Sequence, residues 1–180
     1  MKSARLVVLI TIILVAAAAR VIPHPPNFTP IAAMALFGGA YAPTIWQAVL
    51  VPVGAMVVSD LIIGWHPLAP VIYLSFVLIV GIGCWLRTRK SLATLVAAVG
   101  ASSVSFFLVT NFAVWASGAM YPKTGAGLLA AYVAGLPFLR NTVLGDLFYS
   151  AVLFGSFAAV ERYVASVREA PRAVGSLSRP

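Results

Sequence analysis

Long apolar segments separated by short polar stretches make up almost the whole of this 180-residue sequence. It contains only twelve Lys and Arg and four Asp and Glu, and 62% of its residues are hydrophobic. Soluble domains carry about 25% charged residues, so 9% is too few to cover a globular surface. Segments of about 20 apolar residues can cross a bilayer. The sequence therefore indicates an all-α, polytopic membrane protein, and it excludes a soluble enzyme, a disordered chain and a disulfide scaffold.

We expect six transmembrane helices in a single domain, residues 1–163, followed by a basic, disordered cytoplasmic tail at residues 164–180. The expected segments are residues 6–22, 31–42, 45–64, 69–86, 91–116 and 141–163. Residues 1–19 also fit a cleaved signal peptide, which would leave five spans. We favour a retained first helix, because its apolar run continues to Ile22.

Prolines mark the expected limits of several helices. Three prolines between residues 23 and 26 stop the first segment, because proline lacks an amide donor and clashes with the preceding turn. Thr29 is then a suitable N-cap, with Pro30 in the first turn, for a short second helix that is tilted or only partly crossing. Pro137 is expected to separate the last span from residues 127–136, an apolar stretch too short to cross that lies along the surface or dips into the bilayer.

The distribution of Lys and Arg predicts the orientation. With both termini inside, nine of these residues lie on the inner side and three on the outer side. The nine are Lys2, Arg5, Arg87, Arg89, Lys90, Arg162, Arg168, Arg172 and Arg179, and the three are Arg20, Lys123 and Arg140. Inner loops carry such an excess, so we expect a bacterial inner-membrane protein with cytoplasmic termini. The net charge of +8 reflects this bias, and no nucleic-acid partner is expected.

Polar side chains gather at the expected outer ends of the spans, whereas the inner halves are nearly all apolar. A charge inside a bilayer costs about 2.5–3.5 kcal/mol, so Asp60 and Asp146 must face protein or a wet cavity. Arg20 and Arg140 are the expected counter-charges. For any one of these residues, a structural ion pair is as good an explanation as a ligand site. The convergence of polar residues from five segments favours a ligand pocket.

The predicted pocket would take a small polar solute. Its ligand-binding residues are Arg20, His24, Asn27, Asp60, Asn111, Trp115, Tyr121, Arg140, Asn141 and Asp146. Basic side chains, with Lys123 among them, would hold an anionic or carbonyl-rich group. Asp and Asn side chains would supply hydrogen bonds, and Trp115 and Tyr121 would form apolar walls.

Other polar residues give weaker signals. His66, beside a proline, is interpreted as a solvated loop residue, and Cys84 as an inert small hydrophobe. The His and Asp residues lack short-range metal-ligand spacing, so no metal or other cofactor is expected. No catalytic motif is present, which indicates that the chain is not an enzyme.

Several motifs resemble an uncharacterised bacterial integral-membrane family. They are Arg20-x-x-Pro23-His24-Pro25-Pro26-Asn27-Phe28-Thr29-Pro30, Ser59-Asp60-x-x-x-Gly64, Thr110-Asn111-Phe112-x-x-Trp115, Tyr121-Pro122-x-Thr124-x-x-Gly127-Leu128 and Leu136-Pro137-Phe138-x-x-Asn141-Thr142. More distantly, the size, helix count and the residues Asn27-x-Thr29-Pro30 and Ser59-Asp60 are similar to the S components of energy-coupling-factor vitamin transporters. That likeness implies an S-component-like bundle with an outward pocket for a solute such as a vitamin, partnered by a membrane coupling subunit with ATPases.

The function favoured by the sequence is therefore capture of a small polar solute or vitamin from the outer side of the membrane. A structural or assembly subunit without its own ligand is the alternative. An intramembrane enzyme acting on lipid is the least favoured reading, because no catalytic set is visible.

Overall fold

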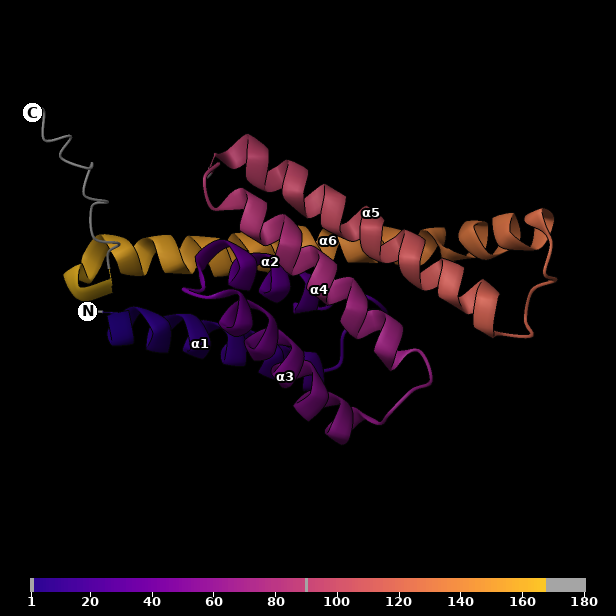
Figure 1. Cartoon of the computed structure of the whole chain (residues 1–180), viewed down its shortest axis with the longest axis horizontal. Helices are drawn as coiled ribbons and strands as arrows, with labels where there is room; N and C mark the ends of the chain where they lie inside the picture. The colour runs from indigo at the N-terminus through magenta and orange to yellow at the C-terminus, as the bar shows by residue number, and fades with distance from the viewer. Residues whose placement is uncertain (1, 90, 168–180) are drawn as a thin grey trace, which may run out of the picture.

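A computed structural model describes residues 2–89 and 91–167, which form helices and connecting segments without strands (Figure 1). The α-helices are α1 (Lys2–Ala18), α2 (Ile31–Tyr41), α3 (Ile45–Ile63), α4 (Ala69–Leu86), α5 (Leu92–Ser117) and α6 (Gly125–Tyr163). Two 3-10 turns, η1 (Ala19–Val21) and η2 (Ala165–Val167), follow α1 and α6. The all-α expectation is confirmed, and five of these helices are long and apolar enough to cross a membrane.

The short helix α2 lies at the centre of the bundle. Its 11 residues span about 16 Å, roughly half of the 30 Å hydrocarbon core. Residues 31–40 are all buried, and α2 packs against each of the other five helices. The second segment is therefore a half-helix enclosed by protein rather than a span exposed to lipid.

Glycines allow α2 and α4 to touch backbone to backbone. A Cβ added to Gly39 would lie 2.3 Å from the Val80 carbonyl oxygen, and one added to Gly83 would lie 2.3 Å from the Leu36 oxygen. Small residues at such crossings let membrane helices approach closely, where packing rather than the hydrophobic effect stabilises them. This contact fixes α2 against α4.

The last helix is far longer than expected. α6 continues from Gly125 to Tyr163 with Pro137 inside it, so the prediction that Pro137 separates two segments is wrong. Membrane helices tolerate an internal proline because neighbouring groups compensate for the missing backbone bond. The 39 residues extend about 58 Å. Together with α5 they form a hairpin that projects beyond the other helices, on the right of Figure 1.

The opposite end of the molecule, called the terminal end, is where α1 begins and α6 ends (Figure 1). There Arg5 forms an ion pair with Glu161 and donates a hydrogen bond of 2.9 Å to the Val167 carbonyl. Val167, in η2, is buried. The predicted tail therefore begins with an ordered turn at residues 164–167, and residues 168–180 lie outside the described residues.

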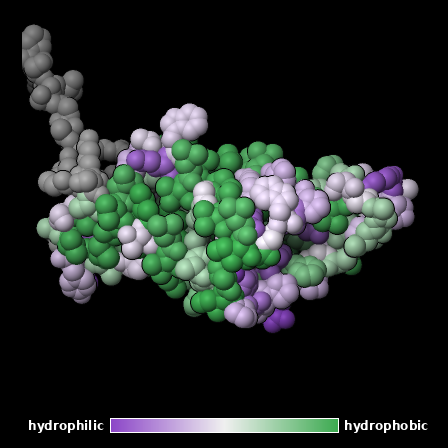
Figure 2. All heavy atoms as spheres, turned by 90° about the horizontal axis from the view of Figure 1, so that it is seen from below, coloured by the Kyte–Doolittle hydropathy of each residue, from purple (hydrophilic) through white to green (hydrophobic). Residues whose placement is uncertain are grey.

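Large apolar side chains cover the outside of the bundle. Leu61, Leu92 and Val15 are among those exposed, as expected of surfaces that face lipid. On the face drawn in Figure 2, green apolar areas extend across the middle of the molecule, and purple polar groups occur right of centre and at the projecting tip.

Candidate ligand-binding site

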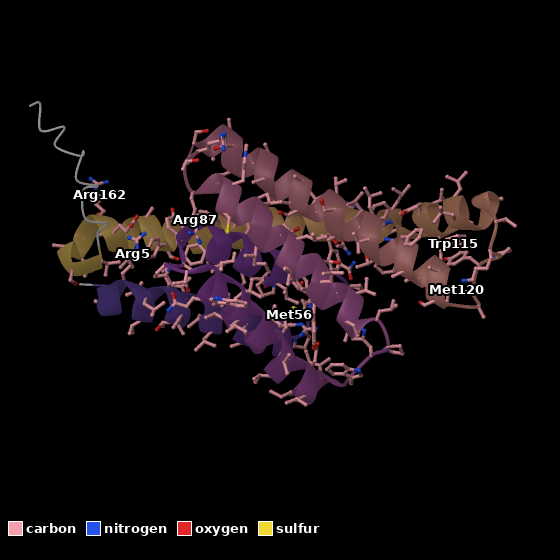
Figure 3. The ribbon with its side chains drawn as sticks, viewed as in Figure 1. Arg5, Met56, Arg87, Trp115, Met120 and Arg162 are labelled. Carbon is pink, nitrogen blue, oxygen red and sulfur yellow. The ribbon has the colours of Figure 1, made fainter. Side chains whose placement is uncertain are left out.

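A buried ion pair joins η1 to α3. Arg20 Nη1 lies 2.6 Å from Asp60 Oδ1, and the Asp60 side chain is only 1% exposed. Tyr73 of α4 donates a hydrogen bond of 2.7 Å to Asp60 Oδ2. Arg20 also donates to Ser59 Oγ and, at 3.5 Å, to the Met56 carbonyl near the centre of Figure 3. The predicted counter-charge of Asp60 is thus present, and the network connects three elements.

The second buried acid of the bundle, Asp146 on α6, is held differently. It is 3% exposed, and its Oδ2 accepts a hydrogen bond of 2.7 Å from Ser103 of α5. No cation among the described residues forms an ion pair with it. Arg140, a predicted counter-charge, is exposed and forms no ion pair within residues 2–89 and 91–167. Asp146 is therefore an uncompensated acid inside an apolar bundle.

A cavity of about 220 Å³ lies beside these two acids. Its lining comes from η1, the segment between η1 and α2, α2 itself, the α3–α4 loop, α4, α5 and α6. The lining residues are Arg20, Asn27, Thr29, Ile31, Ala32, His66, Ile72, Phe76, Phe106, Thr142 and Asp146. The lining thus combines polar and charged side chains with Ile72 and two phenylalanines.

The N-terminal end of α2 opens into this cavity. The helix begins after Pro30, and no described side chain caps it, so the prediction that Thr29 is its N-cap is wrong. The first N–H groups of a helix have no partner within the helix and carry the positive end of its dipole. Ile31 and Ala32, the first two residues of the helix, line the cavity.

The segment between η1 and α2 is held against α6. Asn141 Nδ2 donates a hydrogen bond of 3.0 Å to the Pro26 carbonyl. The Phe28 ring packs on Tyr149 with ring centroids 5.7 Å apart. A Cβ on Gly145 would lie 3.1 Å from Phe28 Cα, so the glycine lets this segment approach the helix next to Asp146. Asn141 thus positions the cavity wall.

The structure separates the remaining predicted site residues from this cavity. His24 Nδ1 lies 2.6 Å from the carbonyl oxygen of Ile22 within its own segment. Asn111 donates to the Phe107 carbonyl of its own helix at 2.9 Å, and a Cβ on Gly135 of α6 would clash with its side chain.

The predicted aromatic walls lie in the projecting hairpin. Trp115 Nε1 donates to the Pro122 carbonyl at 2.9 Å, and Lys123 donates to the Trp115 and Gly118 carbonyls. Tyr121 is in the same α5–α6 loop. Figure 3 shows Trp115 at the tip, far from Met56. The polar residues of the hairpin therefore stabilise its own turn.

The chain is similar to one family of proteins. A family model described as "Family of unknown function (DUF6580)" matches residues 1–169. The chain belongs to this family. No curated protein and no solved structure matches it. The match includes every helix and every residue of the cavity, so the site described above lies within the region that defines DUF6580.

Several residues that line the cavity of this DUF6580 protein, or contact its lining, were not predicted as ligand-binding. His66 lines the cavity although its sequence context favoured a solvated loop. Ser103, which orients Asp146, was visible only as one of two adjacent serines in an apolar span. Thr142 follows the predicted Asn141 directly. Phe76 and Phe106 look like ordinary lipid-facing or core residues and carry no sequence signal.

A second hollow of about 660 Å³ lies between the start of α4 and the projecting hairpin. Its lining is Pro67, Leu68, Val71, Leu108, Val109, Phe112, Ala113, Ala116, Ser117 and Tyr132. Charged groups do not occur in this lining, so it lacks the chemistry needed to hold a polar solute. Within the described part of this DUF6580 chain, no three His, Cys, Asp or Glu side chains cluster closely enough to hold a metal ion.

Proposed function

We propose that this DUF6580 chain is an integral-membrane protein that binds a small polar solute as a step in transport. The observation that carries the proposal is the cavity at the start of α2, where Arg20, Asp146 and uncapped N–H groups meet an apolar wall. Ligand sites combine apolar walls with a few placed polar groups. Ionisable residues inside a membrane are rare and are found along substrate and ion pathways. The role proposed is binding and not catalysis.

The direction of capture follows from the charge bias. Nine of the twelve Lys and Arg fall in segments expected on the inner side, which favours a bacterial inner-membrane protein with cytoplasmic termini. The 15 residues from Arg5 to Arg20 then place the cavity about 22 Å from the cytoplasmic end along α1. This depth is on the outer side of a core of about 30 Å. A solute such as a vitamin would therefore enter from the outside.

Release to the cytoplasm would require a partner. Residues 2–89 and 91–167 form the helical bundle itself, so the energy for release is proposed to come from ATPases in another protein. An S-component-like role, with a membrane coupling subunit and its ATPases, would supply the energy. The lipid bilayer is the environment in which both proteins would meet.

The direct test is native mass spectrometry of gently extracted protein, with identification of any small molecule released. We expect about one solute per chain in the wild type. Ala32→Leu fills the cavity where α2 begins and should abolish the retained solute. Ala116→Leu makes the same change on the exposed hairpin and should retain it. A chain that is empty as wild type, and equally so in both variants, would contradict the proposal.

A structural or assembly subunit is the second candidate, and the projecting hairpin favours it. Phe112, Leu129 and Val133 are exposed on this part of α5 and α6, which extends beyond the other helices. Another membrane protein could cover these side chains. Co-purification of one stoichiometric protein partner with a solute-free chain would support this function over solute binding.

A further inference from the structure

We infer that the solute is a small organic ammonium ion whose positive charge binds Asp146. This inference rests on the proposed function and names the class of its ligand. The charges around the cavity supply the first step. Arg20 is paired with Asp60 at 2.6 Å, so among the described residues Asp146 is the acid of the lining that has no cationic partner. A buried acid without a cation is costly, and a bound cation would remove that cost.

The geometry of Asp146 leaves one oxygen for the ligand. Ser103 donates to Oδ2 at 2.7 Å, whereas Oδ1 accepts no hydrogen bond from residues 2–89 or 91–167. Asp146 lines the cavity although it is only 3% exposed. Ser103 thus fixes the carboxylate while its other oxygen is available to a donor in the cavity.

The second feature that suits an ammonium ion is a pair of aromatic rings in the cavity lining. Phe76 and Phe106 both line the cavity and stack with ring centroids 5.5 Å apart and an interplanar angle of 24°. Phe106 lies three residues after Ser103 on α5, which places both on one helix face. Aromatic faces attract cations, and quaternary ammonium groups are recognised by such rings. A carboxylate and two rings together favour an organic cation over a hydrated metal ion.

The start of α2 indicates what else the ligand carries. The free N–H groups at Ile31 and Ala32 need an acceptor. An ammonium compound with a hydroxyl, carbonyl or carboxylate oxygen at its other end would satisfy both the helix and Asp146. Amino alcohols, betaines and amino acids have this arrangement.

The experiment measures binding to the full chain in nanodiscs of phosphatidylglycerol by calorimetry. The probes are matched pairs in which carbon replaces the charged nitrogen: choline against 3,3-dimethylbutan-1-ol, and glycine betaine against 3,3-dimethylbutyrate. Methylammonium is the smallest probe. We expect at least one ammonium probe to bind and its uncharged or anionic counterpart to bind roughly tenfold more weakly or not at all, because a buried charge pair is lost.

Asp146→Asn should weaken binding of the ammonium probe by a similar factor of about ten, because the amide keeps the shape of the side chain and removes its charge. Glu161→Gln makes the same change at the terminal end of α6, away from the cavity, and should leave binding unchanged. Binding of the carbon counterpart as tightly as the ammonium member, equal binding by Asp146→Asn, or no binding of any ammonium probe would each overturn the inference.

The ammonium group could come from a free metabolite or from a phospholipid headgroup. Native mass spectrometry from nanodiscs containing phosphatidylethanolamine distinguishes these sources, since retained lipid and retained metabolite differ in mass, and Asp146→Asn should lose either one. If the wild type retains a neutral or anionic solute that Ala32→Leu loses, the ammonium inference fails while the proposed function stands. If wild type and Ala32→Leu are both empty, the proposed function fails as well.

Discussion

The two ends of α2 have opposite surroundings. At its C-terminal end, Arg87 donates hydrogen bonds to the carbonyls of Gly39 at 2.7 Å and Ala42 at 3.0 Å. At its N-terminal end, no described side chain caps the helix, and the free N–H groups lie at a cavity. Helix ends leave backbone groups that need partners, and inside a bundle water is scarce. One end is therefore closed by the protein, and the other is left open for a ligand.

The same contrast holds for the two buried acids. Asp60 is enclosed with Arg20 and Tyr73, whereas Ser103 is the one partner of Asp146 among the described residues. The buried charge of Asp60 is thus stabilised by side chains of the same protein. The first N–H groups of α2 lack a side-chain cap and Asp146 lacks a cationic partner among the described residues, and both belong to residues that line the cavity. This coincidence is the physical basis for assigning the cavity a function.

The largest effect is expected at the closed end of α2. Arg87→Ala removes two charge-assisted hydrogen bonds to buried carbonyls and should lower the free energy of unfolding by about 4 kcal/mol. Thermal or SDS-induced unfolding of the purified protein measures this. Arg89→Ala changes an exposed arginine nearby and should cost less than about 0.5 kcal/mol. Equal effects of the two variants would show that α2 does not depend on this cap.

The second-largest loss of stability is expected at Asp60, the acid that is paired with Arg20. Asp60→Asn leaves the partly buried Arg20 without its counter-charge and should destabilise the protein by about 3 kcal/mol. The same unfolding measurement applies. Stability at the wild-type level would mean that the ion pair contributes nothing to the packing of η1 on α3.

A smaller loss is expected where α2 contacts α4. Gly83→Ala places a methyl group against the Leu36 carbonyl and should cost about 2 kcal/mol by overpacking. Gly81→Ala is the matched control on the same helix, because no atom lies within 4 Å of its added Cβ. If Gly81→Ala is as destabilising as Gly83→Ala, the close contact between the helices is not what holds α2.

The smallest effect on stability is expected beside the open end of α2. There the substitution is expected to stabilise the protein or leave its stability unchanged, whereas the three substitutions above destabilise it. Asp146→Asn removes an uncompensated buried charge and keeps a group that can accept from Ser103. We expect the ligand-free protein to be unchanged or stabilised by up to about 1 kcal/mol. A loss as large as that of Asp60→Asn would place Asp146 among the structural acids and weaken the contrast between the two.

Much of the fold is predictable from the sequence because a bilayer leaves few choices for an apolar chain. The long segments and the partial crossing of residues 31–42 follow from hydropathy and from the prolines. The continuity of α6 does not. Proline generally ends helices in water, whereas α6 packs along α5 and continues through Pro137, which no local sequence pattern reveals.

The site was predictable where charge is decisive. Arg20, Asp60 and Asp146 were identified because a charge inside a membrane demands a partner or a cavity. The sequence does not separate Trp115 and Tyr121 from the other polar residues, because they too stand near the expected outer ends of the spans. The projection of the α5–α6 hairpin, which carries these rings away from the cavity, depends on helix lengths and tilts that no local pattern contains.

The N-terminal end of α2 is thus expected to be open to solutes, while its C-terminal end is closed. Thiol labelling with a small water-soluble methanethiosulfonate tests it directly in a Cys84→Ser background, which removes the single native cysteine. Cysteine is introduced by Ala32→Cys at the open end or by Ala40→Cys at the closed end; both positions are buried. We expect rapid labelling of the first cysteine and almost none of the second. Equal protection of both cysteines in the solute-free protein would contradict it.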